Sequence, residues 1–243
     1  MQEESDDESL KRTKKYASSS STSTDITTDV SASSSSADDG NPAKLERTPQ
    51  TRIQQAINPN GPMNQLFSTP AKLVDLLVNY GRQHGYLTNE MTVWECCNGN
   101  GNITDVLKRY GFKVRYSDII ASYSEPELGS LDFFRIGTAP FKFDVIITNP
   151  PFAGYEHAIR TAKALGKPFI FVLPINKLVQ KKFTNAMKNV KYNVFIVQPR
   201  MAFTYVDKDG VTRESNSDCF VVMANFPQCT DVTELHFVHE EDN

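Results

Sequence analysis

The stretch "TVWECCNGNGNITDVLKRYG", residues 92–111, reads as a buried strand, a glycine turn and a helix that Gly111 ends. Gly99 and Gly101 allow a tight turn, and a ligand can approach their backbone closely because they carry no side chain. The helix that follows points its first amide groups toward the same place. The stretch therefore predicts a ligand site at a strand-to-helix turn, although a plain structural turn could carry the same glycines.

Strands and helices alternate along the rest of the chain. Helices are expected over residues 67–85, 155–166 and 177–189, and further strands over residues 113–119, 143–148, 169–174, 192–199 and, as the last one, 218–226. This alternation predicts an α/β fold with a doubly wound, mostly parallel, Rossmann-like sheet. Ligands of such sheets bind at the carboxyl ends of the strands.

The first of these helices has a recognisable start. We expect Ser68 or Thr69 to be its N-cap and Pro70 to lie in its first turn. Its apolar positions fall on one face, which comprises Leu73, Leu76, Leu77 and Tyr80.

The two ends of the chain differ in composition. Residues 1–50 hold almost no large apolar side chains, so they cannot bury enough surface to offset the entropy of ordering, and we predict a disordered Ser/Thr-rich tail. They carry 10 acidic and 6 basic residues, which gives them a net charge of −4. The whole chain has a net charge of −3, so residues 51–243 carry a net charge of +1. A single domain over residues 51–243 is expected, without the strongly basic profile of a dedicated nucleic-acid binder.

Compartment and metal content can also be addressed from the composition. There is no secretory signal and no apolar run long enough for a membrane span, and four cysteines suggest no disulfide framework, so we expect an intracellular protein. The basic run Lys11–Lys15 is a candidate nuclear signal, which leaves cytoplasm and nucleus open. The spacing of Cys and His predicts no metal site.

Acidic residues follow the neighbouring strands at the predicted ligand edge. Glu95 ends the first strand, Asp118 ends the second, and Asp132 precedes the third. A carboxylate after the second strand can accept both ribose hydroxyls of a nucleoside cofactor, as it does for NAD. NAD is the rival cofactor, but Ile103 stands where a dinucleotide fold needs a small residue.

The stretch "TNPPF", residues 148–152, follows a buried strand. Pro150 and Pro151 stiffen the loop, so Asn149 presents its side-chain oxygen in a set direction. That oxygen and the Pro150 carbonyl can both accept hydrogen bonds from one planar amino group, and Phe152 offers a ring for stacking. Because Asn does not titrate, its role would be to orient the amino group rather than to act as a base.

Together these motifs resemble the class I S-adenosylmethionine-dependent methyltransferases, and among them the amino-methyltransferases with a (D/N/S)PP(Y/F/W) motif. The resemblance covers about residues 67–226 and is strongest to the small, phage-type DNA adenine-N6 enzymes. It implies S-adenosylmethionine as the cofactor. It also implies roles for matched residues: Phe67, Thr69 and Pro70 beside the methionine moiety, Glu95 and the turn from Cys97 through Gly99 to Gly101 along the cofactor, Asp118 at the ribose, Asp132 at the adenine amino group, Phe133 on the adenine face, and Asn149, Pro150, Pro151 and Phe152 as the catalytic motif.

The resemblance implies direct methyl transfer to the N6 amino group of a flipped adenine in DNA. RNA adenine comes second and the amide of a protein glutamine third, because the clamp recognises only a planar amino group. A catalytically inactive subunit of a methyltransferase complex is a further alternative.

Contact with nucleic acid would fall on a basic helical surface. Its candidate residues are Lys177, Lys181, Lys182 and Lys188. Only about 90 residues follow Phe152, which leaves little chain for a target-recognition domain. We therefore expect the protein either to methylate alone with little preference for sequence or to depend on a partner subunit for recognition.

Overall fold

The computed structural model describes residues 66–207, 209–230 and 235–239, the last of these by backbone only, and all of them belong to one compact unit, Leu45–Asn243. The predicted tail and the basic run Lys11–Lys15 lie outside the described residues.

A seven-stranded sheet forms the centre of this unit, in the order β2-β1-β3-β4-β8-β5-β9. Its strands are β1 Thr92–Glu95, β2 Lys113–Tyr116, β3 Val145–Thr148, β4 Phe169–Pro174, β5 Tyr192–Gln198, β8 Cys219–Ala224 and β9 Leu235–His239. All pairings are parallel except those of β8, which runs antiparallel between β4 and β5. The predicted α/β fold with a mostly parallel, Rossmann-like sheet is confirmed.

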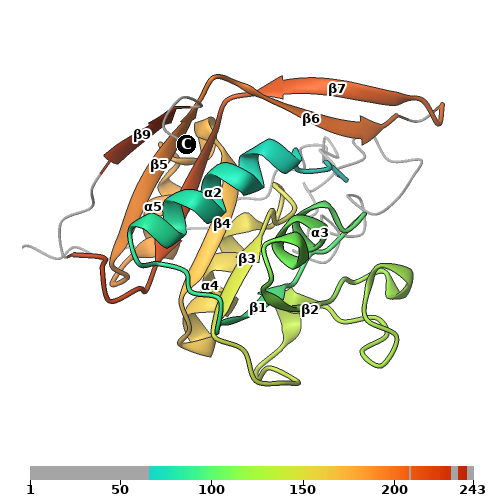
Figure 1. Cartoon of the computed structure of the whole chain (residues 1–243), viewed down its shortest axis with the longest axis horizontal. Helices are drawn as coiled ribbons and strands as arrows, with labels where there is room; N and C mark the ends of the chain where they lie inside the picture. Colours follow the sequence, from blue (N-terminus) through green and yellow to red (C-terminus); the bar gives the residue numbers. More distant parts are fainter. Residues whose placement is uncertain (1–65, 208, 231–234, 240–243) are drawn as a thin grey trace, which may run out of the picture. The chain divides into compact units, whose positions relative to one another are not determined.

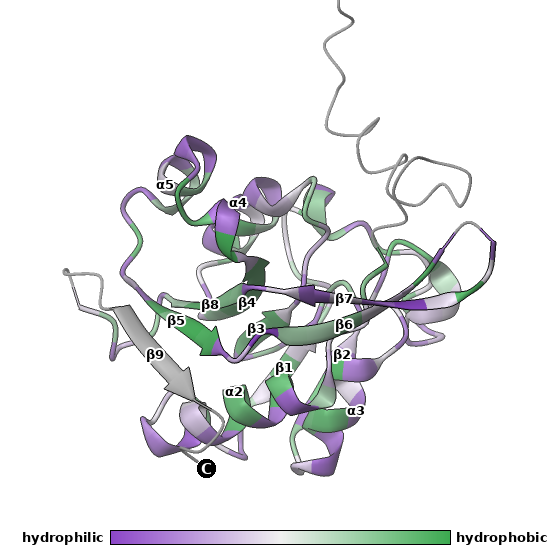
Figure 2. Cartoon of the chain, turned by 90° about the horizontal axis from the view of Figure 1, so that it is seen from above, coloured by the Kyte–Doolittle hydropathy of each residue, from purple (hydrophilic) through white to green (hydrophobic). Residues whose placement is uncertain are grey.

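Helices cover both faces of the sheet. They are α2 Ala71–Gln83, α3 Asn102–Arg109, α4 Tyr155–Leu165 and α5 Lys181–Met187, with 3₁₀ turns η1 Ala121–Tyr123, η2 Phe133–Arg135 and η3 Ile175–Lys177. In Figure 2, α4 and α5 lie on one side of the strands and α2 and α3 on the other. The arrangement follows from the period of two along each strand: Val93 packs in the core under α2 and α3, and its neighbour Trp94 packs in the core under α4 and α5.

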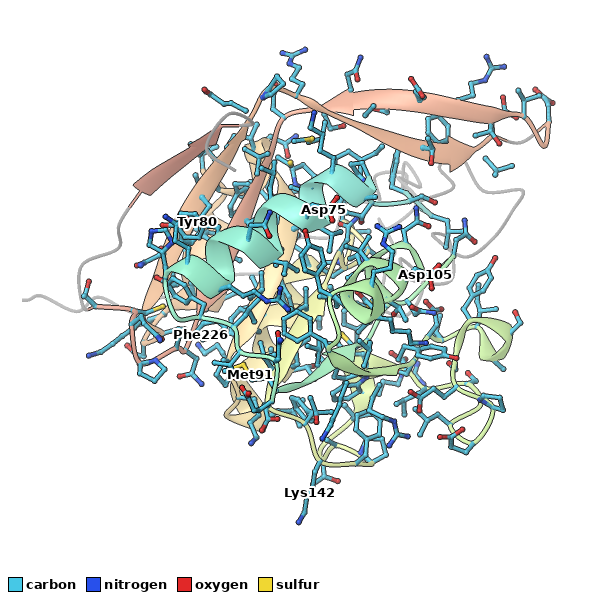
Figure 3. All side chains as sticks on the ribbon, in the orientation of Figure 1. Asp75, Tyr80, Met91, Asp105, Lys142 and Phe226 are labelled. Carbon is cyan, nitrogen blue, oxygen red and sulfur yellow. The ribbon has the colours of Figure 1, made fainter. Side chains whose placement is uncertain are left out.

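The apolar face predicted for the first helix is the one that packs. Leu73, Leu76 and Leu77 are buried, and the ring of Tyr80 meets Phe195 of β5 edge-on at 4.6 Å between centroids. Figure 3 shows Tyr80 near the carboxyl end of α2, over β5. The predicted cap is wrong, because the N-cap is Pro70 in an extended conformation and no side chain bonds to the helix start.

Two other expectations for the second half of the chain need correction. The helix predicted over residues 177–189 is shorter, because η3 precedes it and Gln180, in an extended conformation, separates the two. Residues 218–226 do not form the last strand, because β9 follows and adds to the edge of the sheet at β5.

A separate two-stranded hairpin consists of β6 Met201–Val206 and β7 Thr212–Ser217. It is the long orange ribbon at the top of Figure 1. Thr204 of this hairpin forms a bridge with Ser68, whose amide donates to the Thr204 carbonyl at 2.7 Å. This bridge brings the hairpin to the segment that precedes α2.

Candidate functional site

A cavity of about 270 Å³ opens at the carboxyl ends of β1, β2 and β3. The predicted site residues that line it are Phe67, Thr69, Cys97, Gly99, Asp118, Asp132, Phe133, Asn149 and Pro151. Five others do not line it: Pro70, Glu95, Gly101, Pro150 and Phe152. Nine of these fourteen predicted residues therefore line one cavity, and they come from five separate segments of the chain.

The glycine turn forms one wall. Gly99 and Gly101 both have positive φ, at 48° and 83°, a conformation that side chains other than glycine rarely adopt. Gly101 is the N-cap of α3, so the turn leads directly into that helix. Asn98 holds the turn from inside, since its side-chain oxygen accepts from the Thr104 hydroxyl at 2.6 Å and its amide donates to the Tyr123 carbonyl at 2.7 Å.

Asp118 lies beside this turn and is 7% exposed. Its Oδ2 accepts from the Gly99 amide and its Oδ1 from the Ile120 amide, both at 2.9 Å. Burial raises the pKa of this carboxyl, while the backbone bonds act in the opposite direction. Each oxygen keeps a second lone pair, so the carboxylate can still accept from a ligand in the cavity.

The segment at Asp132 also lines the cavity. Asp132 caps η2, with its Oδ1 accepting from the Phe134 amide at 3.0 Å, and its Oδ2 lies 3.1 Å from Arg135 Nε. The ring of Phe133 is only 2% exposed and meets Trp94 edge-on at 5.4 Å between centroids. Phe134 also lines the cavity and is more exposed than Phe133, although sequence analysis did not select it.

Glu95 does not reach the cavity surface. Its side chain is fully buried, and its Oε1 accepts from the Cys97 amide at 2.9 Å and from the Thr148 hydroxyl at 2.5 Å. Burial is the largest cause that raises the pKa of Glu95, to about 8. Glu95 is therefore a neutral carboxyl group that lies below the floor of the cavity. The sequence had predicted that this residue would lie along the cofactor.

Asn149 faces the cavity from the end of β3. Its Nδ2 donates to the Thr69 hydroxyl at 3.1 Å, and its Oδ1 is buried without a hydrogen-bond partner among the described residues. A buried acceptor that lacks a donor costs about 1–3 kcal/mol, so such an atom commonly marks a ligand position. The amide is therefore oriented by Thr69 with its oxygen available to an incoming N–H group.

Three aromatic rings from distant segments lie in a row next to Asn149. The ring of Phe67 stacks on Phe152, with centroids 5.6 Å apart and planes 21° from parallel, and it also packs against Tyr205 of β6 at 5.3 Å. Phe152 thus has a protein ring on one face. Tyr205 was not among the predicted site residues, and only its aromatic character next to the hairpin turn could have indicated it.

The basic residues proposed for nucleic-acid contact lie away from the cavity lining. Lys182 pairs with Glu156 at 3.4 Å, and the Lys177 ammonium lies 5.6 Å from the centre of the Tyr155 ring. Lys181 and Lys188 are exposed at the two ends of α5. The structure thus engages two of the four lysines in contacts within the protein, and the other two face solvent.

Residues 66–207, 209–230 and 235–239 contain no group of three His, Cys, Asp or Glu side chains placed to hold a metal ion. Within the same ranges, no helix has the length and apolar character needed to cross a membrane.

The chain matches no protein-family model and no curated protein. Solved structures do resemble it. A protein assigned as a class I S-adenosylmethionine-dependent methyltransferase from Listeria monocytogenes aligns with a TM-score of 0.46 and 10% identity, over 77% of this chain and 70% of that one. One assigned as an RNA methyltransferase from Pyrococcus horikoshii aligns at 0.44 and 13%, over 71% and 96%.

A third neighbour carries a different kind of name. A protein assigned as a hemolysin from Lactococcus lactis aligns with a TM-score of 0.47 and 10% identity, over 71% of this chain and 94% of that one. At these identities and TM-scores the neighbours carry no argument about activity, which rests on the residues of the site.

Proposed function

We propose that this chain transfers a methyl group from S-adenosylmethionine to the N6 amino group of adenine in DNA. The observation that carries the proposal is the side-chain oxygen of Asn149, a buried acceptor without a partner among the described residues, in the cavity that the glycine turn and Asp118 also line. One compartment thus combines groups suited to a nucleoside cofactor with a group suited to a planar amine.

The residues of the cavity fit the cofactor in two respects. The remaining lone pairs of Asp118 can accept the ribose hydroxyls, while Gly99 allows the ligand to lie against the backbone. Asp132 and the rings of the η2 segment stand across the cavity, where an adenine ring would find an acceptor and an apolar surface. Bound there, S-adenosylmethionine would supply a methyl group on a cationic sulfur; the amino nitrogen would form the new bond to the methyl carbon as the sulfur–carbon bond breaks, the neutral thioether would leave, and a proton would pass to water.

The chain's own contribution is orientation. Asn149 Oδ1 and the Pro150 carbonyl would accept the two amino hydrogens, which turns the nitrogen lone pair out of conjugation and toward the methyl group. Thr69 keeps the Asn149 amide from rotating, so this acceptor is in place before the target arrives. The target base must leave its stack to reach this depth.

A covalent route through Cys96 is disfavoured at this site. Burial raises the pKa of the Cys96 thiol well above its ordinary value, so the thiolate that a nucleophile requires is disfavoured. Direct transfer therefore needs no residue other than those that orient the amine.

The proposal is tested by incubating the protein with S-adenosylmethionine labelled in the methyl group, together with separate pools of DNA, RNA and protein. We expect the label in DNA, as N6-methyladenine identified by mass spectrometry. Label in RNA adenine or in a protein glutamine amide would redirect the proposal to that substrate. A protein that binds the cofactor and labels none of the pools would contradict it, and would favour the inactive-subunit alternative.

A further inference from the structure

Glu95 lies at the point where the strand order of the sheet changes direction. β1 pairs with β2 on one side and with β3 on the other, and Glu95 and Thr148 are the last residues of β1 and β3. Both side chains are completely buried. The crevice between two such strand ends is where ligands bind in open α/β sheets, so Glu95 lies beneath the floor of this crevice.

One oxygen of Glu95 serves both halves of the site. Oε1 accepts from the Cys97 amide at 2.9 Å, where the glycine turn begins, and from the Thr148 hydroxyl at 2.5 Å, directly before Asn149. The other oxygen, Oε2, is buried without a partner among the described residues. Glu95 therefore joins two segments that are 51 residues apart in sequence, from Cys97 to Thr148, because a single oxygen accepts a hydrogen bond from each.

We propose that Glu95 is a positioning residue that locks the glycine turn to the Asn149 loop, and that it touches neither the cofactor nor the target. The inference rests on the proposed function, because it assigns the cofactor to the turn and the amine to Asn149. It replaces the role along the cofactor that the sequence suggested for Glu95.

The contacts of Thr69 and Glu95 act on two consecutive residues at the end of β3. Thr69 accepts from the Asn149 amide at 3.1 Å, and Glu95 accepts from the hydroxyl of the preceding residue, Thr148, so two neighbouring side chains are held. A displacement of about 1 Å at a reacting group can reduce a rate about a hundredfold. Loss of the Glu95 contact should therefore reduce the transfer rate more than it reduces cofactor affinity.

The surroundings of Glu95 favour its neutral form. Burial raises its pKa, the bonds from Thr148 and Cys97 lower it, and the negative charge of Asp118 from the end of β2 raises it further. Cys96 and Cys97 follow it directly in the chain after the end of β1, and the β3 side presents the Thr148 hydroxyl. Gln is thus the matched replacement, because an amide oxygen can accept the same two bonds without a charge.

The test compares Thr148→Val, which removes the donor, with Thr148→Ser, which keeps it, and with Glu95→Gln. Cofactor affinity is measured by calorimetry and the methyl-transfer rate in single turnover. We expect Thr148→Val to lower the rate about tenfold or more with cofactor affinity changed less than twofold, and the other two variants to stay within about threefold of wild type in both. Thr161→Val, at a buried threonine of α4, controls for the loss of a buried hydroxyl elsewhere.

Two results would overturn the inference. Thr148→Val could leave the rate unchanged, or Glu95→Gln could weaken cofactor binding while the bound cofactor reacts at the wild-type rate, which is the behaviour of a direct cofactor ligand. A wild-type protein that methylates nothing would instead contradict the proposed function. In that case the positioning role of Glu95 is tested by NMR. Thr148→Val should raise the pKa of the Glu95 carboxyl and shift the resonance of the Cys97 amide proton. If neither the pKa nor the resonance changes, the inference is wrong.

Discussion

The side-chain amide of Asn149 donates a hydrogen bond to the hydroxyl of Thr69 at 3.1 Å, across 80 residues of sequence. The segment before α2 and the loop after β3 are thereby joined at the cavity. The contact occupies the nitrogen of the Asn149 amide and leaves its buried oxygen without a partner among the described residues.

Thr69→Val should therefore impair transfer without emptying the cofactor site. Valine has nearly the same shape but cannot accept the Asn149 hydrogen bond, so the amide can rotate and present either end. A net hydrogen bond is worth about 1 kcal/mol, which corresponds to a rate about fivefold lower. Steady-state kinetics with Thr69→Ser as the matched control would measure this. Equal kcat for the valine and serine variants would show that the hydroxyl does not orient Asn149.

Asp118→Ala should weaken cofactor binding by roughly 1.5 to 3 kcal/mol, the range for hydrogen bonds to a charged group. The loss includes the direct contacts to the ribose and the support that Asp118 gives the Gly99 amide. Calorimetric titration with S-adenosylmethionine would measure it, with Asp209→Ala at the exposed hairpin turn as the control for charge. An unchanged dissociation constant would remove Asp118 from the cofactor site.

The free energy of unfolding should depend on pH through the titration of Glu95. Its pKa in the folded protein is about 8, above the ordinary value of 4.5 that applies in the unfolded chain. Between these values the folded protein holds a proton that the unfolded chain has lost, so the free energy of unfolding should fall as the pH rises from about 4.5 to about 8. Glu95→Gln should make the curve flatter across this window. Denaturant unfolding at several pH values would test this, and parallel curves for the two proteins would contradict it.

The exposed lysines at the ends of α5 should affect nucleic-acid affinity through charge alone. If Lys181 and Lys188 contact phosphates, replacing each by alanine should reduce the slope of log affinity against log salt by about one. Lys142 precedes β3, at the end of that strand away from Asn149, and in Figure 3 it points away from the sheet. Lys142→Ala is therefore the matched control, and equal slopes for all three variants would exclude α5 as the contact surface.

Local sequence patterns were sufficient to predict the main segments of the site. The glycine turn, the Asn-Pro-Pro loop and the alternation of strands and helices each depend on neighbouring residues, and the structure brings the turn and Asn149 to one cavity. The same alternation predicted a mostly parallel sheet, but nothing local indicates that β8 runs antiparallel or that β9 follows it.

The errors occurred where a distant contact competes with a local one. Thr69 had the right spacing to cap α2, but its hydroxyl bonds to Asn149 instead. Glu95 has the pattern of a cofactor residue, and only the register between β1 and β3 turns it toward Thr148. Tyr205 contacts Phe67 because Thr204 pairs with Ser68. The pairing of these two segments cannot be predicted from the sequence of either segment alone.

The central claim is that the buried oxygen of Asn149 holds the amine that receives the methyl group. The most direct test is Asn149→Ala, compared with Asn185→Ala at an exposed position of α5, in the labelled-cofactor assay with DNA and in calorimetry. The claim predicts that Asn149→Ala yields no detectable N6-methyladenine while its affinity for S-adenosylmethionine stays within about twofold of wild type, because the oxygen contacts the target and not the cofactor. Methylation by Asn149→Ala at the rate of the Asn185→Ala control, or a loss confined to cofactor affinity, would contradict it.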